Sequence, residues 1–296
     1  MGTIIKATSM EIGNGNDSSV DLGSRVVREC IEKSGIDKRK IVLLINIGII
    51  RENNIVEPAN AALIQKKARL NLAPTTKQIE LGKGTFSFDI MNGACGFLSA
   101  TQIIDSLFKN GAHDNAIIVS CDVHPSGRKV NDFPFTHSAA AMLLERSNDK
   151  QGFTKILYKT SKDAYLGSEQ YFEAEGTNIR KSITIKIADD YSMRLKEFIL
   201  TAIKEFDDNG ELNLQNIDSI IASTPSKTFG REIADALGYT NNTLVETYNV
   251  YGDTYTSSQI IGYHIAFENG TLKEGKKVFF IGGGSGLSCT LGMYIV

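Results

Sequence analysis

The sequence of 296 residues lacks tryptophan and holds only four cysteines, five prolines and four histidines. The cysteines Cys30, Cys95, Cys121 and Cys289 are widely spaced with no CxxC pair, which excludes a disulfide framework and a cysteine zinc site and indicates reduced thiols in a cytoplasmic chain. No apolar run reaches the roughly 18 residues of a membrane span, and the first residues lack the layout of a signal peptide.

The charges show no excess of one sign either. The chain has 32 basic and 34 acidic residues, a net charge of −2, so no strong field favours nucleic acid or an anionic membrane. We expect neither as a partner.

Short β-rich runs alternate with longer helical patterns along the whole chain. This alternation predicts an α/β protein whose sheets are covered by helices on both faces. The expected strands are 41–49, 86–91, 115–121, 139–144, 152–160, 217–223, 277–283 and 288–296, and the expected helices 19–35, 57–71, 95–109, 190–207, 226–237 and 254–268. The polar segment 145–185 is expected to form a junction and a loop.

One internal similarity indicates a duplication. The run SATQIIDSLFKNG (99–111) is similar to TSSQIIGYHIAFENG (256–270), and each precedes a strand pattern. Two related halves, 1–150 and 151–296, would let the N-termini of both helices meet at one site rich in N–H donors. Chance similarity between two amphipathic helices is the alternative.

Five stretches in order resemble the thiolase superfamily, and within it the β-ketoacyl-ACP synthase III-like branch. They are the runs starting at IVLLINIGI, FDIMNGACGF, IIASTPSKTFG, YGDTYTSSQII and GGGSGLSCTLG. The resemblance implies a thiolase-like fold of two similar α/β/α/β/α halves in five layers. It also implies a cysteine that accepts an acyl group, assisted by a histidine and an asparagine.

The chain departs from that pattern at each catalytic position. Asp253 stands where the family has asparagine, and Ser223 stands where it has histidine. Aligned without gaps to the family's DINAACSGF run, DIMNGACGF places Ala94 at the nucleophile, whereas a slip of one residue places Cys95 there. Ser223 cannot act as a base near pH 7, and an ionised Asp253 would repel a malonyl carboxylate.

We therefore expect Cys95, Asp253 and Ser223 to carry any catalysis, as a cysteine-dependent acyltransferase of fatty-acid or polyketide-type metabolism that decarboxylates poorly. The alternative is a non-catalytic subunit paired with an active ketosynthase homologue. His124 and His137 lie in loops that could supply a substitute base, and a third, distant alternative is a sugar- or nucleotide-binding protein.

The resemblance implies an acyl thioester as substrate, with no metal and no permanently bound cofactor. Because the family's adenine-stacking tryptophan is missing, acyl carrier protein is favoured over acyl-CoA as donor. Lys227 and Arg231 are candidates to meet the carrier, and Gly283 and Gly284 to border the acyl site. A homodimer or heterodimer is expected, with the apolar strand 115–121 as the edge that needs covering.

Overall fold

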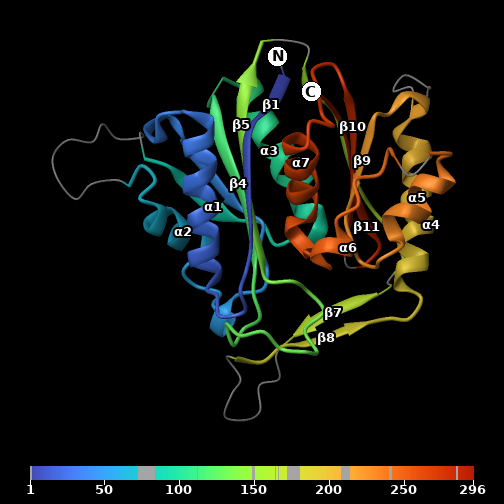
Figure 1. Cartoon of the computed structure of the whole chain (residues 1–296), viewed down its shortest axis with the longest axis horizontal. Helices are drawn as coiled ribbons and strands as arrows, with labels where there is room; N and C mark the ends of the chain where they lie inside the picture. Colours follow the sequence, from blue (N-terminus) through green and yellow to red (C-terminus); the bar gives the residue numbers. More distant parts are fainter. Residues whose placement is uncertain are drawn as a thin grey trace.

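A computed structural model gives the fold, which has five layers (Figure 1). Two sheets stand side by side, helices cover the outer face of each, and two more helices lie between them. The structure describes residues 2–72, 84–111, 113–148, 151–163, 165, 167–171, 181–207, 214–239, 242–284 and 286–296.

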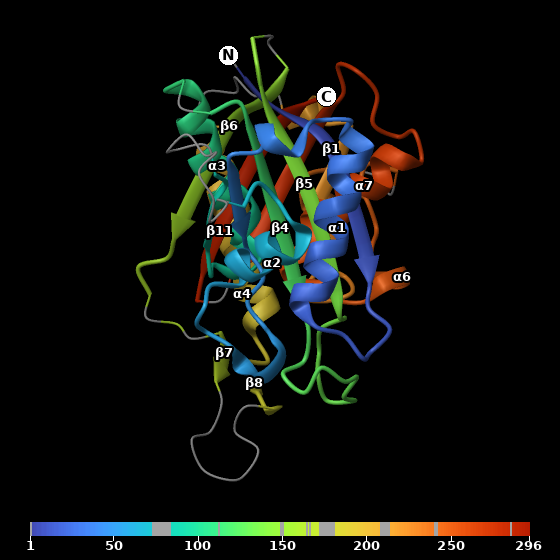
Figure 2. The same cartoon turned by 90° about the vertical axis from the view of Figure 1, so that its left-hand side faces the viewer.

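The first sheet has the strand order β1-β5-β4-β2-β3. Strand β2 pairs in parallel with β3 and β4, while β5 runs antiparallel to β4 and β1. Helices α1 and α2 cover its outer face (Figure 2), and the Ser18 side chain and Gly35 in the left-handed region cap the two ends of α1. The elements are β1 (Gly2–Ile12), α1 (Ser19–Ser34), β2 (Leu43–Asn46), α2 (Asn60–Ala68), β3 (Phe86–Asp89), β4 (Asn115–Asp122) and β5 (Ser138–Ser147).

The second sheet repeats this arrangement with the order β6-β11-β10-β9. An isolated parallel bridge from Ile220 to Leu244 stands where β3 stands in the first sheet. The matching order supports the duplication. The elements are β6 (Gly152–Thr160), α4 (Tyr191–Phe206), β9 (Ser219–Ala222), α5 (Phe229–Ala236), α6 (Tyr248–Tyr251), β10 (Lys277–Gly284) and β11 (Ser288–Ile295), with α4 and α5 on the outer face.

Helices α3 (Gly96–Lys109) and α7 (Ser258–Glu268) form the central layer, as expected for this fold. Their apolar side chains share one core cluster with both sheets, including Leu98 and Ile104 from α3 and Ile260 and Ile261 from α7. Each helix follows a 3-10 turn, η3 (Gly93–Cys95) or η6 (Tyr255–Ser257). Further 3-10 turns are η1 (Lys38–Lys40), η2 (Glu52–Asn54) and η5 (Leu214–Asn216).

The ends of the described chain meet across the two sheets. The Ile5 backbone N–H in β1 donates to the Tyr294 hydroxyl of β11 at 3.0 Å, and Tyr294 itself is buried in the central core. The first and last strands are thereby tied directly to each other.

Three features differ from the sequence-based expectations. Strand β1 was not predicted, and part of the expected loop 145–185 forms the hairpin β7 (Ser168–Tyr171) and β8 (Thr184–Ile187), although 149–150, 164, 166 and 172–180 lie outside the described residues. The expectation that strand 115–121 lies at a sheet edge is wrong. This segment forms β4, which lies between β5 and β2 and is buried throughout, because helices cover both faces of the sheet. The edges of the first sheet are β1 and β3.

No helix in the described ranges is long and apolar enough to cross a membrane.

Candidate active site

A cavity lies where the entries to α3 and α7 meet. Both halves of the chain contribute to it, because parallel strands and their loops end at this same edge of the two sheets. Its lining residues are Ala94, Phe135, Ser168, Ile187, Tyr191, Ser223, Thr224, Pro225, Asp253, Tyr255 and Gly283. The cavity therefore brings together Ser223, Asp253 and Gly283 from the residues that the sequence singled out.

Ala94, and not Cys95, faces this cavity. The Cys95 side chain is completely buried, and its thiol points to the Gly282 carbonyl oxygen at 3.7 Å, on the side of β10. A side chain at Gly284 would meet the Cys95 sulfur at 3.1 Å, so this glycine leaves room for the thiol behind the cavity wall. Of the two candidates for the nucleophile position, Ala94 is the one that lines the cavity.

The expected activation of the Cys95 thiol is also missing. Burial raises the pKa of Cys95 to about 12, whereas a helix N-terminus was expected to lower it. At neutral pH the group is a thiol with almost no thiolate fraction. In this structure Cys95 is a core residue.

Asp253 is the one carboxyl group among the described cavity residues. It follows α6, where Gly252 at φ 70° turns the chain, and its Oδ1 accepts hydrogen bonds from the Tyr255 N–H at 2.8 Å and the Thr224 hydroxyl at 3.2 Å. Burial raises the pKa of Asp253 to about 7, so the expected full negative charge is halved near neutral pH.

Ser223 follows β9 and is held rigidly at the cavity wall. Its backbone N–H donates to the Ile281 carbonyl, and its hydroxyl oxygen accepts from the Gly283 N–H at 3.0 Å. The side chain is 1% exposed. Ser223 can offer its hydroxyl proton to a ligand but has no base beside it.

Aromatic side chains make up much of the remaining wall, and the sequence reasoning missed them. Phe135 stacks on Tyr255 with ring centroids 4.3 Å apart, and Tyr191 donates from its hydroxyl to the Gly284 carbonyl at 2.7 Å. Burial raises the pKa of both tyrosines well above the usual value, so they stay neutral. The signal that could have found Tyr255 was its position directly after the Gly-Asp-Thr turn.

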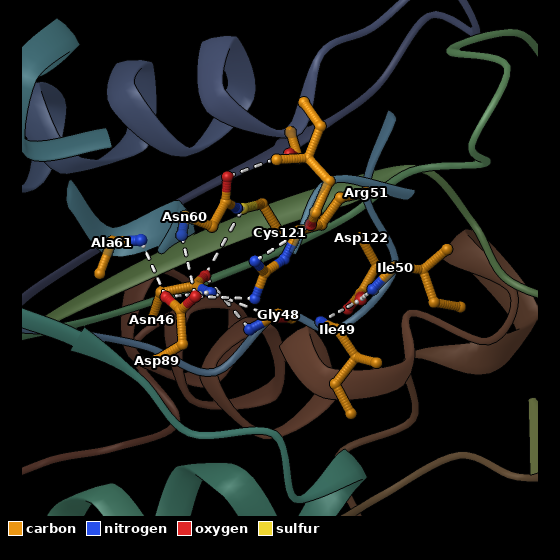
Figure 3. Close-up of polar contacts among 12 residues, drawn as sticks. Asn46, Gly48, Ile49, Ile50, Arg51, Asn60, Ala61, Asp89, Cys121 and Asp122 are labelled. Carbon is orange, nitrogen blue, oxygen red and sulfur yellow. Dashed lines mark hydrogen bonds and ion pairs between the residues drawn. The ribbon is translucent and has the colours of Figure 1, made fainter. Parts of the chain in front are cut away.

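A buried polar network gathers at the ends of strands β2, β3 and β4 (Figure 3). Asp122, at the end of β4, accepts from the backbone N–H groups of Ile49 and Ile50 at 2.8 Å each and from the Thr256 hydroxyl of η6. Burial raises the pKa of the Asp122 carboxyl. Asp122 and Ser120, whose hydroxyl also bonds Thr256, link the first half to the entry of α7.

Asp89 anchors the neighbouring strand β3 in the same network. It pairs with Arg51 at 2.8 Å and accepts from the Asn60 and Ala61 N–H groups at the start of α2, where a negative charge is favourable. Cys121 accepts a hydrogen bond from Asn60 at 3.4 Å and is fully buried.

The remaining candidates lie around the cavity and not in it. Gly284 backs the Cys95 thiol, Lys227 is exposed beyond Pro225, and Arg231 pairs with Glu246 at 3.1 Å and with Asp235. Arg231 is therefore already engaged by two carboxylates. Lys227 keeps an exposed ammonium near the cavity.

His124 and His137 lie outside this cavity. The His137 Nε2 atom accepts from the His124 backbone N–H at 3.0 Å, and the His124 Nδ1 atom accepts from the Ser126 N–H. His137 lines an adjoining cleft that shares only Phe135 and Asp253 with the cavity. Burial lowers the pKa of both histidines, and neither reaches Ala94 as a substitute base.

Among the residues that the structure describes, no group of three or more histidine, cysteine, aspartate or glutamate side chains could hold a metal ion.

Comparisons with known proteins find the same fold. Residues 208–294 match the family model described as 3-oxoacyl-[acyl-carrier-protein (ACP)] synthase III C terminal. The chain is 24% identical to β-ketoacyl-[acyl-carrier-protein] synthase III of Aliarcobacter butzleri, over 94% of this chain and 83% of that protein. It is 23% identical to the Clostridium perfringens enzyme of the same name, over 92% and 83%.

Two solved structures share the fold. OleA of Xanthomonas campestris, with bound lauric acid and lauroyl-CoA, superposes with a TM-score of 0.81 at 14% identity, covering 100% of this chain and 99% of that one. FabH, a 3-oxoacyl-(acyl carrier protein) synthase III of Pseudomonas aeruginosa, gives 0.81 at 14%, covering 100% and 98%. The chain thus has the five-layer thiolase-like fold of these structures, and its residues 208–294 are similar to the C-terminal part of β-ketoacyl-ACP synthase III proteins.

Proposed function

We propose that this chain is a non-catalytic, β-ketoacyl-ACP synthase III-like subunit that pairs with an active homologue in fatty-acid-type acyl metabolism. One observation carries the proposal: the cavity presents the Ala94 methyl group where an acyl-accepting thiol is needed, and the Cys95 thiol is buried behind the wall. Acyl transfer from a thioester needs a nucleophile that can reach the carbonyl carbon.

The other positions of the cavity support the same conclusion. Ser223 has no adjacent base, and Asp253 has no cation among the described lining residues to stabilise a carbanion. Two neutral donors of the family pattern are thus changed together with the nucleophile. The alternative, a Cys95-dependent acyltransferase, would need the η3 turn to shift by one residue and expose the thiol.

The edge strand β3 is where we place the partner. It pairs with β2 on one side, and no described strand pairs with its other side. Three large apolar side chains on and beside this edge are exposed, Phe86 at 64%, Met91 at 59% and Val56 at 67%. An apolar, unpaired strand edge favours addition of a strand from a second chain.

An acyl carrier protein remains the favoured source of any acyl group near the cavity. The chain has no tryptophan to stack on the adenine of CoA, and Lys227 is exposed beside the cavity residues Thr224 and Pro225. We propose the carrier as a partner of the assembled pair, with Lys227 as a contact.

The test is affinity purification of the tagged chain from its native host, followed by mass spectrometry. We expect to recover a synthase III-like chain with an intact cysteine, histidine and asparagine, and we expect Phe86→Glu to abolish recovery. Phe267→Glu is the matched control, since Phe267 is 51% exposed at the end of α7, away from β3.

Intact-mass analysis after incubation with acyl-CoA and acyl-ACP panels completes the test. We expect no acyl adduct on this chain and an adduct on the recovered partner. An adduct on the wild-type chain that disappears in Cys95→Ser would refute the non-catalytic proposal, as would a chain that purifies alone under all conditions.

A further inference from the structure

A second pocket, here called the side pocket, lies between the first half and the hairpin of β7 and β8. Its volume is about 140 Å³, whereas that of the cavity is about 40 Å³. Because one water molecule needs about 10–15 Å³ on the same measure, the cavity alone holds only a few waters. The side pocket is mainly apolar, and its aliphatic lining residues are Ile49, Ile50, Ile55, Val56, Met91 and Ile183.

The Tyr255 side chain lies between the cavity and the side pocket. Its ring lines the cavity. Its hydroxyl oxygen accepts from the side-chain N–H of Gln170 at 3.1 Å, and Gln170 lines the side pocket. A methyl group at Gly93 would lie 3.3 Å from the same oxygen, and Met91, two residues earlier, also lines the side pocket. The ring therefore crosses the wall that separates the two spaces.

The backbone of Tyr255 is strained. Its φ is 46°, in the left-handed region. Tyr255 is the first residue of the turn η6, and Gly93, the first residue of the corresponding turn η3, has φ 51°. Glycine adopts this conformation without a steric penalty, whereas a bulky side chain adopts it rarely. A tyrosine in this conformation persists only where its surroundings hold it, and such positions cluster at functional sites.

Three contacts hold Tyr255 in this conformation. Phe135 stacks on its ring with the centroids 4.3 Å apart, and its backbone N–H donates to Asp253 Oδ1 at 2.8 Å. The third contact is the hydrogen bond from Gln170 to the hydroxyl group. These partners come from the first half, from the turn before η6 and from the hairpin, so the ring is fixed from three separate parts of the chain.

We propose that Tyr255 is a plug that divides one hollow into two and thereby sets the length of the ligand that the cavity takes. With the ring in place, only a small group fits beside Ala94, and a longer apolar chain is excluded because the ring fills its path to the side pocket. Tyr255 thus determines specificity by excluded volume. This inference goes beyond the proposed function and does not depend on it, since the plug limits an enzyme and a non-catalytic subunit alike.

The experiment attaches alkyl chains of increasing length inside the cavity. In the complete chain carrying Ala94→Cys and Cys95→Ser, the thiol at position 94 is labelled with methyl, butyl, hexyl and octyl methanethiosulfonate. The thiol displaces methanesulfinate and forms an alkyl disulfide, and intact mass confirms a single label. The three remaining cysteines are buried. Urea titration then gives the equilibrium constant of unfolding for each labelled protein.

The expected result depends on the side chain at position 255. With tyrosine, lengthening the label should leave the unfolding constant unchanged or raise it, because the added CH₂ groups stay in solvent or strain the wall. Tyr255→Gly removes the ring and suits the left-handed backbone. In this variant each CH₂ group added beyond butyl should lower the unfolding constant about fourfold, because it becomes buried in the side pocket.

Two further variants complete the design. Tyr255→Asn also opens the passage and tolerates the left-handed region, so it keeps the test decisive if Tyr255→Gly does not fold. Tyr255→Phe is the matched control, because it keeps the ring and loses only the hydrogen bond from Gln170. We expect Tyr255→Asn to respond to chain length as Tyr255→Gly does, and Tyr255→Phe to respond as tyrosine does.

Three results would overturn the proposal. The first is an equal gain per CH₂ group with tyrosine in place, since the ring would then block nothing. The second is the absence of any gain in the opened variants, and the third is a gain in Tyr255→Phe equal to that in Tyr255→Gly. None of these results bears on partner recovery or on acyl labelling of Cys95, so failure of this inference is distinguishable from failure of the proposed function.

Discussion

The entries to the two central helices are built alike and do different things. Before α3, the turn η3 turns Ala94 toward the cavity and hides Cys95. Before α7, Asp253 lies two residues ahead of η6 and lines the cavity. The turn η6 itself contributes Thr256, whose hydroxyl donates to Asp122. The entry to α3 contributes the apolar Ala94 to the cavity wall, whereas the entry to α7 contributes the carboxyl group of Asp253.

The two central helices also differ in depth. Helix α7 is buried along nearly its whole length, while α3 exposes one face that includes Ile103 at 40%. The two sheets and central helices share one arrangement, and the local turn residues set what each helix entry can do. Four predictions test this difference, taken from the largest expected effect to the smallest.

Thiol reactivity should separate Ala94 from Cys95 most strongly. In a Cys95→Ser background, the substitution Ala94→Cys should react with iodoacetamide at pH 8 about 10³-fold faster than Cys95 does in the wild type. The high pKa of Cys95 accounts for about 10² of this after allowing for its greater intrinsic nucleophilicity, and burial accounts for the rest. Quenched labelling followed by peptide mass spectrometry measures both rates, and equal rates would mean that the turn does not hide Cys95.

Removal of Asp122 should weaken the link between the first half and the entry of α7. Asp122→Ala leaves the backbone N–H groups of Ile49 and Ile50 without their acceptor, whereas the Thr256 hydroxyl keeps Ser120 as a partner, so we expect a loss of about 3 kcal/mol in the free energy of unfolding. Urea unfolding measures it. Asp122→Asn, which keeps one carbonyl oxygen, is the control and should lose clearly less.

Asp253 should make stability depend on pH. Its carboxyl has a raised pKa in the folded state, from 3.8 to about 7, so its favourable contribution is fully present below pH 3.8 and is lost as pH rises to about 7. Asp253→Asn does not titrate, so it should match the wild type at pH 4 and be more stable at pH 8. The full shift corresponds to roughly 4 kcal/mol, and because Asp253 is only partly buried at the cavity we expect about half of this, roughly 2 kcal/mol. Urea unfolding of both proteins at the two pH values decides; a constant difference would show that Asp253 is solvated.

Glycines that face the sheets should separate the two helices by a smaller amount. A methyl group at Gly262 in α7 would lie 2.6 Å from the Ile221 side chain, whereas one at Gly96 in α3 would lie 3.1 Å from Ile47. Gly262→Ala should cost about 1.5 kcal/mol by overpacking. In Gly96→Ala the steric contact is milder, and the better helix propensity of alanine offsets most of its cost. The midpoint of thermal unfolding should therefore fall less than in Gly262→Ala. A larger destabilisation by Gly96→Ala than by Gly262→Ala would contradict this and would mean that α3 is packed more tightly than α7.

Hydrophobic periodicity was sufficient for most of the fold. The runs at 115–121 and 277–283 were recognised because strands buried on both faces are continuously apolar. Strand β1 escaped because polar and apolar residues mix in Gly2–Ile12, as its half-buried edge position allows. The order of strands, which makes β4 internal, depends on pairing between distant segments that no local pattern encodes.

The site was predictable in part. Ser223 and Asp253 were expected from the resemblance to the synthase III-like family, and both line one cavity. The choice between Ala94 and Cys95 depended on a one-residue register in a 3-10 turn, which Gly93 at φ 51° sets through backbone geometry. The raised pKa of Asp253 depends on its burial in a cavity whose lining comes from distant parts of the sequence, Tyr191 and Phe135 among them.

The hydrogen bond from Ile5 to Tyr294 has a consequence for the order of folding. Strand β11 leaves the ribosome after the other described strands, and until it arrives β1 lacks this contact and the central core lacks the Tyr294 ring. Contacts of such sequence separation form late and slowly. During synthesis the first sheet must therefore wait with the apolar inner face of its helices uncovered, and a nascent chain of this kind is a natural client for chaperones.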